Sequence, residues 1–169
     1  MVKFILIIMT SMSLFSNSLV KELESLNTNQ LVVLHNTYEA GKAFDLQLTM
    51  TAIAWHESHF GEVPINISDP SCGVFHNLLS SVANRHNIRL NNYNKNILCM
   101  KLINNYEFAF SESLNELLFW KSVHRKRSAK WSKMVMSYNA GYHYKNGKAY
   151  LREIQAKVKA LKVFLKKDL

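Results

Sequence analysis

Glu57 is the residue whose position first indicates chemistry. It lies in the segment from Trp55 to Gly61, which reads W-H-E-S-H-F-G. Upstream of it, apolar residues recur at helical spacing, and Glu57 extends this row, which consists of Leu46, Met50, Ile53 and Ala54. Burial on this face, and the negative end of the helix dipole just before Gly61, both favour the protonated carboxylic acid. Such an acid can donate a proton to a leaving group, as the acid of a glycosidase does.

The same position also has a purely structural interpretation. Glu57 can be a carboxylate at the edge of an amphipathic stripe, paired with His56 or His59. A metal site is not expected, because the histidines and cysteines lack the spacing of metal ligands, and no cofactor is implied. The segments that would surround Glu57 are therefore needed to distinguish a catalytic from a structural role.

The first residues are predicted to be a secretory signal peptide. Lys3 precedes an apolar run from residue 4 to 15, and Ser16-Asn17-Ser18 supplies small residues for cleavage after Ser18. The alternative is an uncleaved membrane anchor, but the run is short and interrupted by polar residues. Residues 1–18 are thus the expected signal peptide and 19–169 a single domain, with no transmembrane segment in the mature form and a periplasmic or secreted location.

Charge and cysteine content fit an exported protein. The chain has 21 Lys and Arg against 12 Asp and Glu, a formal net charge of +9, which favours anionic envelope surfaces as partners. Nucleic acid would suit this charge, but export argues against it. The two cysteines, Cys72 and Cys99, most simply form one disulfide in an oxidising compartment, and the alternative is two buried free thiols.

The rest of the chain predicts an all-α domain. There are only two prolines and five glycines, and no stretch alternates with the period of a strand. Asn27 and Gln30 have the form of a capping box at the start of a helix that Gly41 ends. Asp45 is expected to cap the helix that carries Glu57. Further helices are expected after a turn within 73–85, from Ile97 to Ile103 after a surface connection at 87–96, from Ser111, from Trp131 to Gly141, and from Tyr150.

Three short motifs occur in an order that narrows the chemistry. They are E-S-H-F at residues 57–60, G-V-F-H at 73–76 and S-Y-N-A-G at 137–141, followed by Tyr150 at the start of the last helix. Together they resemble the soluble lytic transglycosylase family, which has a goose-type lysozyme-like fold, over roughly residues 45–154. The resemblance implies a single lysozyme-like helical domain with a substrate groove.

The resemblance also implies an activity. The family cleaves the β-1,4 bond between N-acetylmuramic acid and N-acetylglucosamine in peptidoglycan and leaves 1,6-anhydromuramyl ends. Ordinary glycoside hydrolysis needs two carboxylates, whereas this chain offers one well-placed carboxylate, Glu57. If the C6 hydroxyl of the muramic acid attacks the anomeric carbon, Glu57 alone can serve as acid and then as base.

The family pattern assigns supporting roles near the catalytic helix. Ser58 would hydrogen-bond near the glutamate or the substrate, or else cap the helix end. Gly73 would let the backbone approach the sugar, or else serve only as a turn glycine. Val74 and Phe75 would line the groove, or else belong to the core.

The second group of implied residues lies on the later helices. Tyr138 and Asn139 are expected at a buried helix end. Tyr138 and Tyr150 would direct their hydroxyls toward Glu57, and Asn139 would do the same or tie down the helix end. For each tyrosine the alternative is a packed core position, because a buried phenol usually finds some polar partner.

The chain departs from the family pattern in informative ways. His76 stands where the family commonly has Gln, which adds a titratable group that could shift the pH optimum, and Ser137 replaces Ala. Glu62 and Asp69 remain candidates for a second carboxylate. Either of them, at roughly 6.5–9.5 Å from Glu57, would favour an inverting muramidase instead.

The sequence leaves a third interpretation open, a cell-wall-binding or assembly component without turnover. Peptidoglycan glycan strands are the expected partner under all three. A secretion or conjugation machine, wall turnover and phage entry are the settings in which this chemistry is used.

Overall fold

The computed structural model describes residues 18–128 and 130–166. The signal peptide expected at residues 1–18 lies, except for Ser18, outside the described residues. Residues 18–24 are helical, and Leu19, Val20 and Leu23 are buried in the core.

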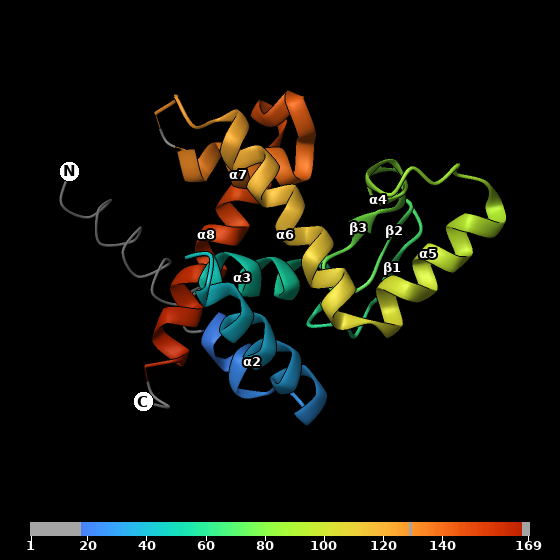
Figure 1. Ribbon diagram of the computed structural model, residues 1–169. Coiled ribbons are helices and arrows are strands. Elements are labelled where there is room, and N and C mark those ends of the chain that lie inside the picture. Colours follow the sequence, from blue (N-terminus) through green and yellow to red (C-terminus); the bar gives the residue numbers. More distant parts are fainter. Residues whose placement is uncertain (1–17, 129, 167–169) are drawn as a thin grey trace.

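The described chain is mostly helical, as the sequence predicts, with one small sheet that the sequence does not predict (Figure 1). The elements are α2 (Thr28–Lys42), α3 (Gln47–Ser58), β1 (Ile65–Asn66), β2 (Ser71–Cys72), β3 (Asn77–Leu78), α4 (Leu79–Arg85), α5 (Asn92–Asn104), α6 (Tyr106–Val123), α7 (Lys130–Ala140), a 3-10 segment (Gly141–Gly147) and α8 (Lys148–Phe164). The strands pair antiparallel in the order β1-β2-β3.

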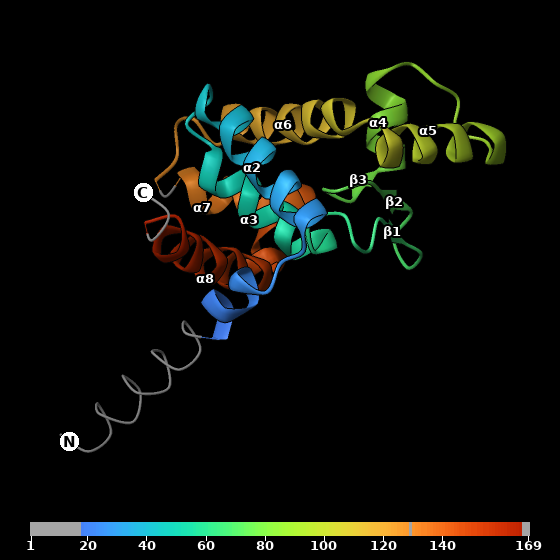
Figure 2. The same ribbon diagram turned by 90° about the horizontal axis from the view of Figure 1, so that it is seen from below.

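Helix α3 lies at the centre of the helical part of the molecule. It packs against α2 and α8, and α6 and α7 lie on its other sides (Figure 1). Met50, Ile53, Ala54 and Trp55 have no exposed surface, because apolar residues occur all around this helix. The sheet lies beside this helical part together with α4 and α5 (Figure 2). Glu57, in the last turn of α3, is therefore carried by the most buried helix of the fold.

Four predicted helix starts can be compared with the residues that cap these helices, and one of the four predictions is correct. The capping box of Asn27 at the start of α2 is confirmed. Asp45 does not cap α3: it has φ +56°, and Leu46 occupies the cap position without a side-chain hydrogen bond. Helix α5 starts earlier than predicted, because Asn91 accepts a hydrogen bond from the Asn94 amide. Likewise Asn105, and not Ser111, caps α6.

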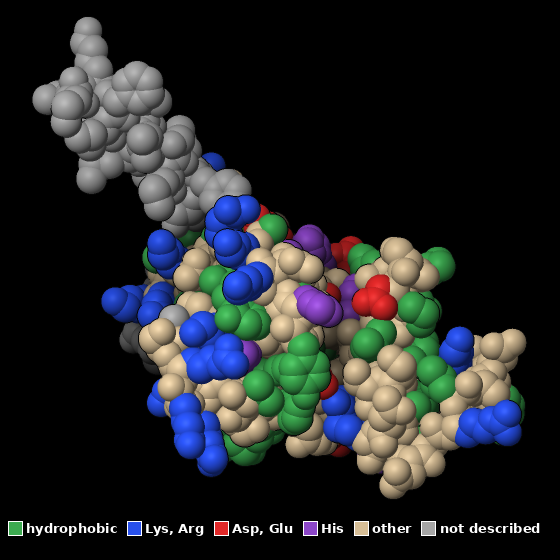
Figure 3. All heavy atoms as spheres, turned by 90° about the horizontal axis from the view of Figure 1, so that it is seen from above, with side chains coloured by type: hydrophobic (Ala, Val, Ile, Leu, Met, Phe, Trp, Pro, Cys, Tyr) green, Lys and Arg blue, Asp and Glu red, His purple; other side chains and the backbone are tan. Residues whose placement is uncertain are grey.

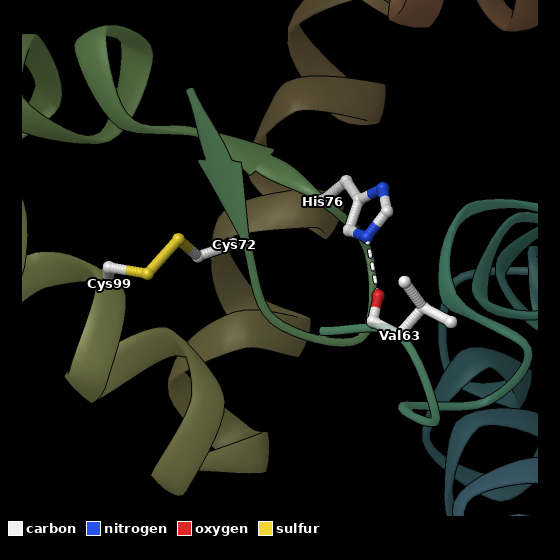
Figure 4. Close-up of a disulfide and its surroundings, with 4 residues drawn as sticks. All are labelled: Val63, Cys72, His76 and Cys99. Carbon is white, nitrogen blue, oxygen red and sulfur yellow. Dashed lines mark hydrogen bonds between the residues drawn. A yellow bond between two sulfur atoms is a disulfide. The ribbon is translucent and has the colours of Figure 1, made fainter. Parts of the chain in front are cut away.

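The Cys72–Cys99 disulfide is confirmed. It joins β2 to α5, with a Cα–Cα distance of 5.2 Å across 27 residues of sequence. Figure 4 shows it on β2, which leads into the turn that carries His76. The bond therefore fixes the turn to a helix that is distant in sequence.

Gly73, which directly follows the disulfide, provides a first test of this arrangement. Its φ is +83°, and a Cβ there would lie 2.6 Å from the Leu102 carbonyl oxygen of α5. Gly73→Ala is therefore expected to lower the free energy of unfolding by about 2–4 kcal/mol, measured by urea denaturation. Gly141→Ala is the control, because Gly141 has φ +56° but open space around it, and about 1 kcal/mol is expected. Equal losses would contradict close packing of the turn on α5.

Candidate active site

Glu57 and Tyr150 form the centre of the candidate site. The Glu57 side chain is 17% exposed, and its Oε1 accepts a hydrogen bond of 2.7 Å from the Tyr150 hydroxyl. Tyr150 lies in the first turn of α8 and is buried. Burial, and next the negative charge of Glu57, raise the pKa of Tyr150 well above its ordinary value. The phenol therefore remains a hydrogen-bond donor that holds the carboxylate in one orientation.

His76 contacts the other oxygen of the same carboxylate. It lies in the β2–β3 turn with φ +43°, and its Nδ1 is 3.5 Å from Glu57 Oε2. Its Nε2 is 2.8 Å from the carbonyl oxygen of Val63, and Figure 4 shows the ring directed at that oxygen. Burial opposes protonation of His76, but the Glu57 carboxylate and the Val63 carbonyl outweigh it, so the pKa of His76 is raised above 6.5.

Tyr138 supports the turn and does not direct its hydroxyl at Glu57, contrary to the expectation from the family pattern. Its hydroxyl donates to the Phe75 carbonyl oxygen at 3.0 Å and lies 3.0 Å from Ser113 Oγ of α6. Its ring stacks on that of Tyr150, with centroids 6.4 Å apart. Burial raises the pKa of Tyr138, so this phenol also stays protonated. Of the two expected tyrosines, only Tyr150 contacts the carboxylate.

Of the two roles expected for Ser58, the structure shows the one at the helix end and not a contact with Glu57 or a substrate. Its hydroxyl donates to the Val74 carbonyl oxygen at 2.6 Å and accepts from the Gly61 amide at 2.8 Å. The residue is 1% exposed, so it faces the protein and not a substrate. Ser58 thus ties the end of α3 to the turn that carries His76.

The expected groove-lining roles of Gly73, Val74 and Phe75 do not match the structure. Val74 and Phe75 are buried in the core, and Gly73 lies against the backbone of α5. The physical reason is packing: the Phe75 ring lies against Tyr106 and Phe110 of α6, and Gly73 lies against Leu102 of α5. Of this segment, His76 therefore belongs to the site, whereas Val74 and Phe75 belong to the core and Gly73 packs against α5.

A pocket of about 260 Å³ opens beside Glu57. In the space-filling view a hollow separates the helical part from the part built on the sheet, with acidic and histidine side chains beside it (Figure 3). The expected site residues that line the pocket are Glu57, His76, Tyr138 and Asn139. Asn139 is exposed, so it is positioned to meet a ligand and does not lie at a buried helix end as predicted.

Two of the other carboxylates share this pocket. Asp69, which is exposed, and Glu116 of α6 both line it, whereas Glu62 accepts a hydrogen bond from Gln30 at 3.0 Å and lies outside it. Glu116 is held by Arg85 at 2.6 Å and by the indole of Trp120 at 2.7 Å. Asp69 is therefore the less restrained of the two.

Sequence reasoning missed Arg85, Glu116 and Trp120, which form one wall of the pocket. The 3.6-residue period of α6 places Glu112 and Glu116 on one face, and this signal could have indicated a shared basic partner. Arg85 bonds to both carboxylates, with its Nε 2.8 Å from Glu112. Nothing in the sequence pairs this face with α4, because the two are far apart along the chain.

Within residues 18–128 and 130–166, no group of three or more His, Cys, Asp and Glu side chains could hold a metal ion. None of the helices described there is long and apolar enough to cross a membrane. Comparison with protein-family models, with curated proteins and with solved structures finds no significant match. The function is therefore inferred from the site together with the resemblance of the three sequence motifs.

Proposed function

We propose that this protein is an exported peptidoglycan lytic transglycosylase in which Glu57 is the single acid and base. One observation carries the proposal: a mostly buried glutamate at a helix end is oriented by the Tyr150 phenol and lines an open pocket. The resemblance of the three sequence motifs gives this arrangement its substrate, the bond between N-acetylmuramic acid and N-acetylglucosamine.

The proposed reaction needs no second carboxylate. Glu57 donates its proton to the glycosidic oxygen, and the C1–O4 bond breaks with its electron pair going to that oxygen. The C6 hydroxyl of the muramic acid then attacks C1, and its proton goes to the Glu57 carboxylate. Tyr150 holds Oε1 in both steps, so the carboxyl group need not reorient between them.

A hydrolytic muramidase on the same fold is the second candidate, and Asp69 is the observation that favours it. This exposed carboxylate lines the same pocket as Glu57 and could activate a water molecule. Glu116 is a poorer choice, since its two oxygens are occupied by Arg85 and Trp120. The Asp69→Asn variant distinguishes the candidates: a transglycosylase keeps its rate, whereas a hydrolase that uses Asp69 loses it.

Digestion of purified glycan strands followed by mass spectrometry tests the proposal directly. The expected products end in 1,6-anhydromuramic acid. Products with reducing ends would indicate the muramidase. Binding to isolated sacculi without any soluble muropeptide would indicate a non-catalytic wall-binding component and would contradict both enzymatic candidates.

Tyr150→Phe is expected to lower kcat roughly 10–100-fold with little change in KM, because the phenol acts on the carboxylate and does not line the pocket. Phe retains the ring that packs on Tyr138, so the melting temperature should change little. Tyr142→Phe is a matched control, because Tyr142 is 74% exposed and does not line the pocket. Equal effects of the two variants would exclude the orienting role of Tyr150.

Export is part of the proposal. The apolar segment at the N-terminus, with cleavage after Ser18, is the proposed signal peptide, and the Cys72–Cys99 disulfide is compatible with an oxidising compartment. The excess of Lys and Arg would hold the protein near anionic envelope polymers. Envelope-spanning secretion or conjugation machinery is a proposed setting.

A further inference from the structure

His76 is fixed in a way that leaves one nitrogen for Glu57. The Val63 carbonyl can only accept a hydrogen bond, so the Nε2 atom 2.8 Å away must carry a proton. The neutral imidazole therefore has its lone pair on Nδ1, which is 3.5 Å from Glu57 Oε2. With a side chain only 9% exposed, His76 has little room for another orientation.

This geometry allows two arrangements of the same proton. In one, Glu57 is a carboxylic acid and His76 is neutral; in the other, Glu57 is a carboxylate and His76 is an imidazolium that carries the proton on Nδ1. Both have the same net charge, and a small movement that closes the 3.5 Å gap interconverts them.

Apart from Glu57, the groups around His76 do not compete for this proton. The titratable and charged residues that line the pocket with His76 are Glu57 of α3, Asp69 of the β1–β2 connection, Arg85 of α4, Glu116 of α6 and Tyr138 of α7. Arg85 and Glu116 bind each other at 2.6 Å, and burial keeps the Tyr138 phenol protonated. Asp69 is exposed to solvent. Among these residues, Glu57 is the one whose side chain contacts the imidazole, with Oε2 at 3.5 Å from Nδ1.

We propose that His76 is a positioning residue that shares one proton with Glu57 and so keeps the carboxyl group supplied with the proton it donates. The inference rests on the proposed function of Glu57. When the pair is in its imidazolium form, the proton moves from Nδ1 to Oε2 and then to the glycosidic oxygen as the C1–O4 bond breaks. The pair is left with a carboxylate and a neutral imidazole, and the C6 hydroxyl returns one proton as the C1–O6 bond forms.

The sign of the pH dependence follows from this sharing. The Glu57 carboxylate beside His76 raises the pKa of the imidazole above its ordinary value. The pair therefore still holds its one shared proton at a pH where a free imidazole would have lost it. Activity should then fall as the pH rises through the pKa of the pair. A glutamine at position 76 keeps hydrogen-bonding capacity but holds no such proton.

The experiment has one readout that does not need activity. Two-dimensional NMR of the imidazole nitrogens should show an Nε2-protonated neutral form of His76 that titrates above pH 6.5, and Glu57→Gln should lower that pKa. A titration of His76 that is the same with and without the Glu57 carboxylate overturns the proposal, even if the enzyme cleaves glycan normally. A lowered pKa in a protein that cleaves no glycan supports the proton sharing and overturns the proposed function instead.

The second readout is the pH profile of kcat/KM. His76→Gln is expected to move the alkaline limb to lower pH and to leave the rate at acidic pH within a few-fold of wild type. His59→Gln is the matched control, because His59 Nε2 also lies 3.5 Å from a carboxylate, that of Glu22, but outside the pocket. A uniform loss of rate in His76→Gln, with an unmoved limb, would mean that His76 only holds the turn in place and overturns the proposal.

Discussion

Glu57→Gln is expected to abolish glycan cleavage, with a fall in kcat of at least roughly 1,000-fold, because the amide can neither donate nor accept the proton that the reaction moves. The fold should survive, since the glutamine oxygen can still accept the hydrogen bond from the Tyr150 hydroxyl. Release of soluble muropeptides from purified sacculi, followed over time, measures the rate. The melting temperature reports on the fold.

The matched control for this variant is Glu62→Gln. Glu62 lies on the loop that follows α3, is exposed and does not line the pocket, so the same substitution there should leave the rate within about two-fold. If Glu57→Gln cleaves at the wild-type rate while it remains folded, Glu57 is not the acid. Its contacts with Tyr150 and His76 would then be purely structural.

Removal of the disulfide is expected to lower the free energy of unfolding about as much as Gly73→Ala does. The Cys72→Ser, Cys99→Ser double variant should lose about 3 kcal/mol of unfolding free energy, because the bond closes a loop of 27 residues that the unfolded chain would otherwise be free to open. Urea denaturation at constant protein concentration measures the difference. Activity should fall as well, since the turn after Cys72 carries His76 and is bonded to Tyr138 through the Phe75 carbonyl.

Reduction of the wild-type protein is the control for the two substitutions. Dithiothreitol should reproduce the loss of stability, and re-oxidation should restore it. An unfolding midpoint that does not respond to reduction would contradict the role of the bond in holding β2 against α5. A response in stability without any response in activity would show that α5 alone keeps the turn in place.

Several features of this protein follow from the sequence by itself. The periodicity of apolar residues places Glu57 on an inward row, and this pattern alone specifies the central helix. Asn27 and Gln30 specify the start of α2, because a capping box is satisfied within four residues. Two cysteines, in a chain whose N-terminal apolar run predicts export, leave one simple pairing. Each of these features is local or depends on a count, so no tertiary information is needed.

Local signals failed where neighbouring residues could not decide the outcome. Asp45 resembles a helix cap but adopts φ +56°, and Leu46 takes that position as the chain packs on α2. The strands have only two residues each, which is too short for an alternating pattern to be seen. The sheet exists because the Cys72 segment pairs with two neighbours, and that pairing is a property of the folded turn.

The roles within the candidate site were decided by the tertiary structure. Sequence motifs grouped Ser58, His76, Tyr138 and Tyr150 around Glu57, but only the packing of α8 and of the β2–β3 turn determines that Tyr150 and His76 contact the carboxylate. Ser58 and Tyr138 instead bind backbone carbonyls of that turn. The periodicity of a helix determines which face is buried, whereas the direction of a hydroxyl depends on the acceptor that another element supplies. The sequence by itself therefore determined the helix that presents Glu57, and the tertiary structure decided which groups hold its two oxygens.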